Sequence, residues 1–171
     1  FHLPRRLARK FRRRPFEVRC DTAFERVIRE CAAPANDRPE TWINEEIIAL
    51  YTELNLMGRA HSVECWQADR LVGGLYGVTL GAAFFGESMF SRKSDASKVA
   101  LVHLVERLRA GGYALLDTQF VTEHLSGFGA VALPRGTYLE QLRAALERQA
   151  TFYPFDSEFS SKMAQSSTQT S

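Results

Sequence analysis

The stretch 60–85 reads AHSVECWQADRLVGGLYGVTLGAAFF, and it decides the fold. It is rich in β-branched and aromatic residues, is interrupted by glycines, and contains three strand-like runs at 60–67, 71–80 and 82–85. Ala68, Asp69 and Arg70 form a turn between the first two runs. A β-meander is the simplest arrangement of three such consecutive runs.

On the N-terminal side of this stretch, the sequence predicts a basic helix followed by a strand. Pro4 opens the helix, Leu7 and Phe11 lie four residues apart on its apolar stripe, and Pro15 ends it. In residues 16–20, apolar and charged side chains alternate, which predicts a strand.

Two further helices are predicted before the meander. Asp21 or Thr22 caps the first, whose apolar residues keep helical spacing as far as Cys31. A polar loop follows, and the second helix runs from about Asn44 to Met57.

On the C-terminal side, a long helix, a strand and a final helix are predicted. Ser94 or Asp95 caps the long helix, which ends at the glycines 111–112. The strand at 113–120 has an almost wholly apolar first half, as expected at the centre of a sheet. The final helix covers about 134–149.

These elements predict an α/β or α+β fold: a mixed, mainly antiparallel sheet with helices on both faces. A GNAT-type acyltransferase sheet suits their order, although the pattern alone does not single it out. With 171 residues in all, we expect one domain over 1–150. The Ser- and Thr-rich residues 156–171 predict a disordered tail.

The composition, 45% hydrophobic and 25% charged, is that of an ordinary soluble protein. The sequence has no apolar run of about 18 residues and no signal-peptide core, so we expect a cytoplasmic protein without a membrane span. Cys20, Cys31 and Cys65 form no C-x-x-C pair, which argues against a zinc knuckle and a disulfide framework. Each is interpreted as a small core residue.

The net charge of +2 hides a strong asymmetry. Residues 1–19 carry a local charge of +7, which leaves about −5 for the rest of the chain. A charge run is more often a solvated helix face, but this excess favours a phosphate-binding surface on the helix of about 4–14. Binding of nucleic acid there would weaken steeply with salt. The arginines singled out are Arg5, Arg9, Arg12 and Arg13.

Glu87 is the first candidate for chemistry. It belongs to the segment 86–92, where a carboxylate and two hydroxyls stand beside aromatic residues at the point where a strand is predicted to leave the sheet. The structural alternative is that Glu87 pairs with Arg92 and that Ser88 makes a turn.

Asp117 and Gln119 are the second candidate. They are two residues apart and so point to the same face of the predicted strand. An acid in so apolar a strand is costly to bury unless it is paired or functional. Alternatively, Asp117 accepts hydrogen bonds from a helix N-terminus.

Several kinds of site are not indicated. The sequence has no H-x-x-x-H or H-E-x-x-H pattern, so no metal site is predicted. It also has no nucleophile elbow, P-loop or G-x-G-x-x-G, so covalent catalysis has no candidate residue. Trp42 either stacks on a base or packs as a core or staple residue.

Several of these segments are similar to the signature blocks of leucyl/phenylalanyl-tRNA–protein transferases, in order and without gaps. LDTQ at 116–119, His124, Pro134-Arg135 and the basic opening also fit, so the resemblance covers about residues 1–145. The blocks themselves are HSVECW at 61–66, LVGGLYGV at 71–78, GESMFSR at 86–92 and ASK at 96–98.

The resemblance implies a GNAT-like domain that transfers Leu or Phe, and Met less well, from aminoacyl-tRNA to proteins with N-terminal Arg or Lys. The products would enter the N-end rule degradation route, no cofactor would be needed, and the protein would act as a monomer. By position, Glu87, Asp117 and Gln119 are the catalytic residues, and Trp42 holds the terminal adenosine. The pocket for the Leu or Phe side chain is formed by Leu75, Phe84, Leu104 and Leu116.

The resemblance also implies that the small N-terminal domain of the family is absent here. Two other functions stay open: an acyl-CoA-dependent GNAT N-acyltransferase and a noncatalytic tRNA-binding module. The first is disfavoured because the stretch 70–75, RLVGGL, departs from R/Q-x-x-G-x-G/A at its last position.

Overall fold

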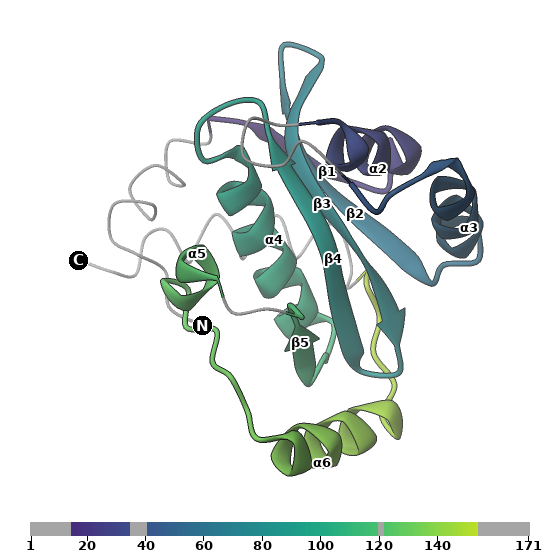
Figure 1. Cartoon of the computed structure of the whole chain (residues 1–171), viewed down its shortest axis with the longest axis vertical. Helices are drawn as coiled ribbons and strands as arrows, with labels where there is room; N and C mark the ends of the chain where they lie inside the picture. The colour runs from purple at the N-terminus through teal and green to yellow at the C-terminus, as the bar shows by residue number, and fades with distance from the viewer. Residues whose placement is uncertain (1–14, 35–40, 120–121, 154–171) are drawn as a thin grey trace.

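A computed structural model describes residues 15–34, 41–119 and 122–153 as a five-stranded sheet with helices on both faces (Figure 1). Neighbouring strands pair in chain order, and all pairs are antiparallel except the parallel pair of β4 and β5. The α+β prediction is therefore confirmed, while the GNAT likeness stays a prediction. The strands are β1 (Glu17–Cys20), β2 (Ala60–Gln67), β3 (Arg70–Leu80), β4 (Ala83–Ser91) and β5 (Leu115–Asp117).

The predicted meander is confirmed as β2, β3 and β4. Ala68 and Asp69 connect β2 to β3 with positive φ angles of 47° and 58°, as in a two-residue turn whose twist matches that of the strands. β4 is longer than the predicted strand at 82–85, because pairing with β3 continues through residues with low β propensity. The prediction that the chain leaves the sheet at 86–92 was therefore wrong.

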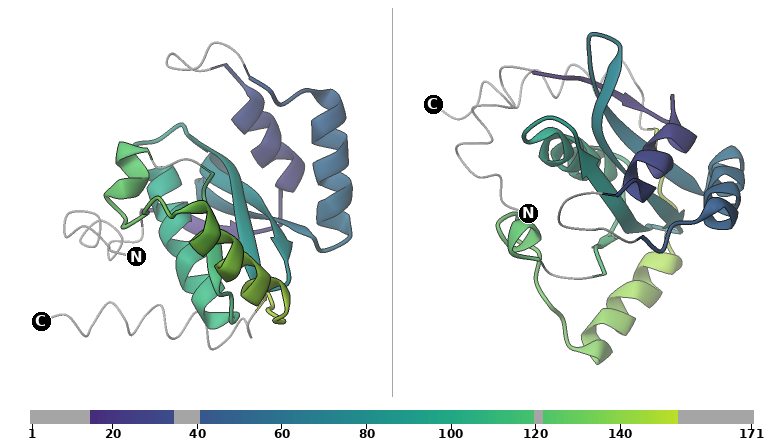
Figure 2. Two further views of the ribbon diagram at one scale, coloured as in Figure 1. Left: turned by 60° about the horizontal axis from the view of Figure 1, so that its bottom comes forward. Right: turned by 45° about the horizontal axis from the view of Figure 1, so that its top comes forward.

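One face of the sheet is covered by α4 (Ala96–Ala110), and the other by α2 (Phe24–Ala32) and α3 (Glu45–Leu56), as Figure 2 shows. Each face has its own apolar cluster. Val99, Leu101 and Leu108 are among the residues of α4 in the first, and Phe24, Ile28 and Ile48 are among the residues of the second.

The long α4 explains the place of β5. A helix that connects two strands and packs on the sheet allows them to run parallel, and β5 accordingly lies beside β4. It is an edge strand of the described sheet, so the expectation of a central strand at 113–120 was wrong. Its residues are half-buried.

Two short helices complete the described chain. α5 (Glu123–Ser126) lies near the start of α4, and α6 (Arg135–Leu146) lies past the ends of β4 and β5 (Figure 1). The carbonyl of Ala145 accepts a bond from Ala82 N–H at 2.8 Å, which attaches α6 to the β3–β4 turn. After α6, Phe152 is buried and stacks on His61 with ring centroids 4.0 Å apart.

Helix capping agrees only in part with the predictions. Asn44 caps α3 by accepting a bond from Ile47 N–H at 2.9 Å. Asp21 and Thr22 do not cap α2, because Ala23 stands at the N-cap position and their side chains bond to β2 instead. Asp95 is at the N-cap of α4, but no side chain caps that helix.

The remaining structural predictions have mixed outcomes. Cys31 and Cys65 are buried core residues as predicted, whereas Cys20 is half-buried. The basic helix of about 4–14 and the tail at 156–171 lie outside the described residues. Within the described residues, no helix is long and apolar enough to cross a membrane.

Candidate active site

A β-bulge in β4 positions Glu87. The register between β3 and β4 passes from Tyr76 opposite Ser88 to Gly77 opposite Gly86, so Glu87 is the extra residue. A Cβ on Gly77 would lie 2.2 Å from a backbone oxygen of β4, so only glycine allows this approach of the strands. A bulge bends its strand and redirects the side chain, and Glu87 thereby reaches a residue beyond β5.

Asp117 and Gln119 meet Glu87 at the end of β5. Gln119 has a φ of 62°, so the chain turns after β5 rather than continuing as a strand. Its backbone N–H donates to Asp117 Oδ1 at 2.7 Å, and its side-chain Nε2 donates to Glu87 Oε2 at 2.9 Å. The prediction of one shared strand face was wrong, yet the three residues are joined: Gln119 binds Asp117 through its backbone N–H and Glu87 through its side chain.

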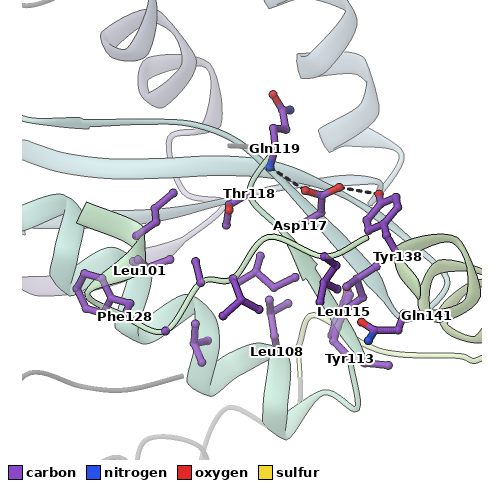
Figure 3. Close-up of a pocket in the computed structure, with 18 of the residues that line it drawn as sticks. Leu101, Leu108, Tyr113, Leu115, Asp117, Thr118, Gln119, Phe128, Tyr138 and Gln141 are labelled. Atoms are coloured by element: carbon purple, nitrogen blue, oxygen red, sulfur yellow. Dashed lines mark hydrogen bonds between the residues drawn. The ribbon is translucent and has the colours of Figure 1, made fainter. Parts of the chain in front are cut away.

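Tyr138, in the first turn of α6, completes this chain. Its hydroxyl donates to Asp117 Oδ2 at 2.6 Å, as Figure 3 shows. The hydrogen bond to Asp117, followed by burial, raises the pKa of Tyr138 to about 12. Tyr138 is therefore a fixed donor at neutral pH. Sequence reasoning missed it, because nothing in the spacing of 21 residues shows that α6 returns to β5.

Tyr51 of α3 approaches Glu87 from the other face of the sheet and was also missed. Burial, then the charge of Glu87 and a hydrogen bond to it, raise the pKa of Tyr51 to about 12. The ring of Tyr51 packs edge-on against Tyr76, with centroids 5.5 Å apart. Its position in the apolar pattern of the helix predicts only a core residue, because the pattern does not show which group the Tyr51 hydroxyl contacts.

A groove of about 980 Å³ lies beside these residues, between α4, β5, the chain after α5, and α6 (Figure 3). Asp117, Gln119 and Tyr138 supply polar groups to its lining, while Leu101, Leu108 and Phe128 contribute to its apolar walls. An apolar cavity with a few convergent polar groups is the usual form of a small-ligand or substrate site.

The structural alternatives for Glu87 and Asp117 are not what the structure shows. Arg92 donates to Glu30 at 2.8 Å instead of pairing with Glu87. Asp117 accepts from a side chain of α6 rather than from the N–H groups at a helix N-terminus. Both carboxylates are half-buried and can accept further hydrogen bonds.

The available chemistry is that of hydrogen-bond acceptance and proton transfer. Carboxylates and an oriented amide can hold an amine and take its proton. Within the described ranges, no group of three or more His, Cys, Asp or Glu residues is placed to hold a metal ion.

Comparison with known proteins connects this geometry to a family. Residues 1–143 match the family profile described as leucyl/phenylalanyl-tRNA protein transferase. A leucyl/phenylalanyl-tRNA–protein transferase of Paramagnetospirillum magneticum is 62% identical over 152 residues, which cover 89% of this chain and 73% of that protein. One of Phenylobacterium zucineum is 63% identical over 153 residues, covering 90% and 69%.

The chain belongs to the leucyl/phenylalanyl-tRNA–protein transferase family. The four residues predicted to form the aminoacyl pocket of this family lie in two settings. Leu75, Phe84 and Leu104 are buried at 3% exposure or less, in the apolar cluster below α4. Leu116 packs against the same cluster and also lines the groove. Leu116 is thus the one predicted pocket residue shared by core and groove.

Trp42 is not brought to the groove by the described structure, and the basic helix of about 4–14 lies outside the described residues. Trp42 precedes α3, is 51% exposed, and is not among the residues that line the groove. Such exposure disagrees with a core role. The four arginines predicted to bind tRNA lie outside the described residues.

The stretch 70–75, which departs from the acyl-CoA motif R/Q-x-x-G-x-G/A, lies within β3. Gly73 and Gly74 lie inside β3, paired with β2 on one side and β4 on the other. An acyl-CoA pyrophosphate needs backbone N–H groups exposed at a turn into a helix. Paired strand residues do not offer them.

Proposed function

We propose that the protein is an aminoacyltransferase that moves Leu or Phe, and Met less well, from aminoacyl-tRNA to the α-amino group of acceptor proteins. The acceptors begin with Arg or Lys, and the modified proteins are marked for N-end rule degradation. The observation that carries this is the hydrogen-bonded chain Glu87, Gln119, Asp117 and Tyr138 at the groove. Membership in the transferase family supports the reaction.

The reaction is aminolysis of an ester. The acceptor's α-amine nitrogen attacks the carbonyl carbon that joins the amino acid to the tRNA ribose, a peptide bond forms, and the ester C–O bond breaks. The amine loses a proton, and the ribose oxygen leaves as a hydroxyl after taking one up. An α-amine has a pKa of about 7.7–8.0, so a sizeable fraction is neutral at physiological pH, and positioning supplies much of the rate. No cofactor is needed.

Gln119 orients the attacking amine. Glu87 accepts from its Nε2, so the amide's carbonyl end is turned away from Glu87 and is available to an amine N–H. Asp117 accepts the proton from the amine and relays it toward the leaving oxygen. Tyr138 and the Gln119 backbone N–H each hold one oxygen of Asp117, which fixes the carboxylate in place.

Charge explains the acceptor preference. Glu87 and Asp117 place two carboxylates close to the position of the amine, and these favour a first residue with a cationic side chain. The donor's Leu or Phe side chain packs on Leu116, next to the cluster that holds Leu75, Phe84 and Leu104. A pocket of this kind separates side chains by size at only about 1–3 kcal/mol per methylene, so some Met transfer is expected.

The tRNA is held elsewhere on the same unit. Trp42 stacks on the terminal adenosine, and the basic segment of about 4–14 binds phosphates through Arg5, Arg9, Arg12 and Arg13. We place the catalytic domain in residues 1–150, acting as a monomer in the cytoplasm.

The test uses labelled Phe-tRNA and peptides that start with Arg, Lys or Ala. Label is expected on the first two peptides only. Equal labelling of the Ala peptide would contradict the acceptor assignment. Binding of tRNA without any transfer would identify a noncatalytic module, and heat released on titration with acetyl-CoA would favour the acyl-CoA enzyme.

A further inference from the structure

The groove runs along an unpaired strand edge. Leu115 N–H bonds toward β4, to the carbonyl of Ala82 at 3.3 Å. Because successive residues of a strand direct their backbone groups to opposite sides, the N–H and C=O of Leu116 point away from β4. No strand of the described residues pairs with β5 on that side, and residues 113–119 all line the groove. An unpaired edge of this kind is a template for an added strand.

The opposite wall of the groove is an apolar segment. Residues 130–133 have no helix or strand structure, and Val131 and Leu133 line the groove with 69% and 38% exposure. Large apolar side chains exposed beside a cavity mark a surface that an occupant covers. A polypeptide between this segment and β5 would find backbone groups on one side and apolar side chains on the other.

Charge fixes the orientation of that polypeptide. Asp117 stands at one end of β5, near Glu87, and Tyr113 precedes the other end (Figure 3). Arg109 also lines the groove and comes from the last turn of α4, close in sequence to Tyr113. A chain with a positively charged N-terminus is therefore complementary when its first residue lies at Asp117 and the following residues run toward Tyr113.

We propose that the first three or four residues of the acceptor protein add to β5 as an antiparallel strand and exchange backbone hydrogen bonds with Leu116. This inference rests on the proposed function, because it takes the acceptor amine to be at Asp117. Side chains stand perpendicular to a sheet, whereas backbone groups lie in its plane. Leu116 thus offers its side chain to the donor amino acid and its backbone to the acceptor, which brings the two reacting groups together.

A consequence for specificity follows from this geometry. Backbone hydrogen bonds read an extended chain, not its sequence. The acceptor is thus selected by its first residue and by having an unfolded N-terminus, while residues 2 to 4 are free to vary.

The decisive experiment is an N-methyl scan of an Arg-initiated hexapeptide, with transfer from labelled Leu-tRNA as the readout. One backbone amide is methylated at position 2, 3 or 4, and a peptide methylated at position 6 is the control. Since alternate residues face β5, position 3 must respond differently from positions 2 and 4. Where the methylated amide is one that faces β5, loss of its hydrogen bond should raise the acceptor KM about threefold to tenfold and leave kcat within about twofold.

A variant of the far wall gives an independent measurement. Val131→Ala should raise the KM of the hexapeptide and leave that of arginine amide, which has no further residues, unchanged. Leu50→Ala, which trims an exposed apolar side chain of α3, is the matched control and should change neither. Suppose that the unmodified hexapeptide is labelled, but the effect of methylation on KM is the same at every position or declines steadily from position 2. The added acceptor strand is then refuted, while the proposed transferase function is supported. If no peptide is labelled, both fail.

Discussion

Two hydrogen-bond networks built on carboxylates lie toward opposite edges of the sheet and differ in how completely they are satisfied. The closed network joins β1, β2 and the chain after α6 through Asp21 and Glu64. The open network joins β4, β5 and α6 through Glu87, Asp117, Gln119 and Tyr138. Both contain two acids, but only the open network reaches the groove, through Asp117, Gln119 and Tyr138.

The closed network leaves no place for a substrate. Glu64 has no exposed surface and accepts from the Ala23 N–H at 2.8 Å, the Ser62 hydroxyl at 2.9 Å and Trp66 Nε1 at 3.0 Å, as well as from the Thr22 hydroxyl. Asp21 likewise accepts from the Ser62 N–H at 2.6 Å and from Asn55 Nδ2 at 3.2 Å, lies 2.7 Å from His61 Nδ1, and accepts from the Tyr153 hydroxyl. A buried carboxylate needs such donors to be tolerated at all.

The difference separates stability from function. An acid in an apolar strand is a sign of either role, and Glu64 in the buried β2 meets that description better than Asp117 does. What distinguishes Asp117 is the half-exposed setting beside the groove, with lone pairs that the fold does not use. Substitutions in the closed network should therefore unfold the protein, and those in the open network should slow transfer.

The largest effect is expected for Glu64→Leu. The Ala23 and Trp66 N–H groups are held by the fold and would be left buried without an acceptor, at about 1–3 kcal/mol each. The free energy of unfolding, measured by urea denaturation, should fall by about 2–6 kcal/mol. Glu64→Gln keeps one acceptor oxygen and should lose less. A loss from Glu64→Leu below about 1 kcal/mol would mean that the network does not support the fold.

The next effect is that of Asp117→Asn on catalysis. The substitution keeps the size of the side chain but removes its ability to take a proton, so the transfer rate should fall about 100-fold or more. The free energy of unfolding should change by less than about 1 kcal/mol, because the residue is half-buried. Transfer from Phe-tRNA to an Arg-initiated peptide at the parental rate would show that Asp117 has no role in the reaction.

A smaller effect is expected for Tyr138→Phe, which removes one hydrogen bond to Asp117 and keeps the ring. Since the role assigned to Tyr138 is to position Asp117, kcat should fall about threefold to tenfold while the acceptor KM stays within about twofold. Tyr153→Phe is the matched control, because it removes a bond to Asp21 in the closed network. It should lower the free energy of unfolding and leave kcat unchanged. An equal loss of kcat in both variants would contradict the assignment of different roles to the two networks.

The sequence predicted the order of most elements and three of the four residues of the open network, but neither Tyr138 nor the geometry. Alternation and helical spacing are local signals, so β2, β3, α3 and α4 were found close to their bounds. The bulge at Glu87 arises from pairing with β3, and the φ of Gln119 from the turn after β5. Neither the bulge nor the turn produces a periodic pattern in the sequence.

Contacts between distant segments were out of reach for the same reason. Tyr138 meets Asp117, and Tyr153 meets Asp21, only because α6 and the chain after it fold back on the sheet. The edge position of β5 was missed because apolar composition reports burial, not the number of strand neighbours.

The smallest effect concerns Tyr51, which joins the apolar cluster under α3 to Glu87. Its folded pKa of about 12 lies above the unfolded value of about 10, so the folded protein holds this proton more tightly. The stability it contributes is present in full below pH 10 and is lost as the pH rises toward 12. Because Tyr51 is only half-buried, we expect this loss of stability to be less than about 1 kcal/mol.

The measurement is urea denaturation of the parent and of Tyr51→Phe between pH 9 and pH 11.5. The loss appears as a decrease, over this pH range, in the difference between their free energies of unfolding. Burial is the first cause of the raised pKa of Tyr51 and Glu87 is the second. Most of this decrease should therefore remain when both proteins also carry Glu87→Gln. If the decrease disappears in the presence of Glu87→Gln, the pKa of Tyr51 is set by the open network rather than by burial in the core.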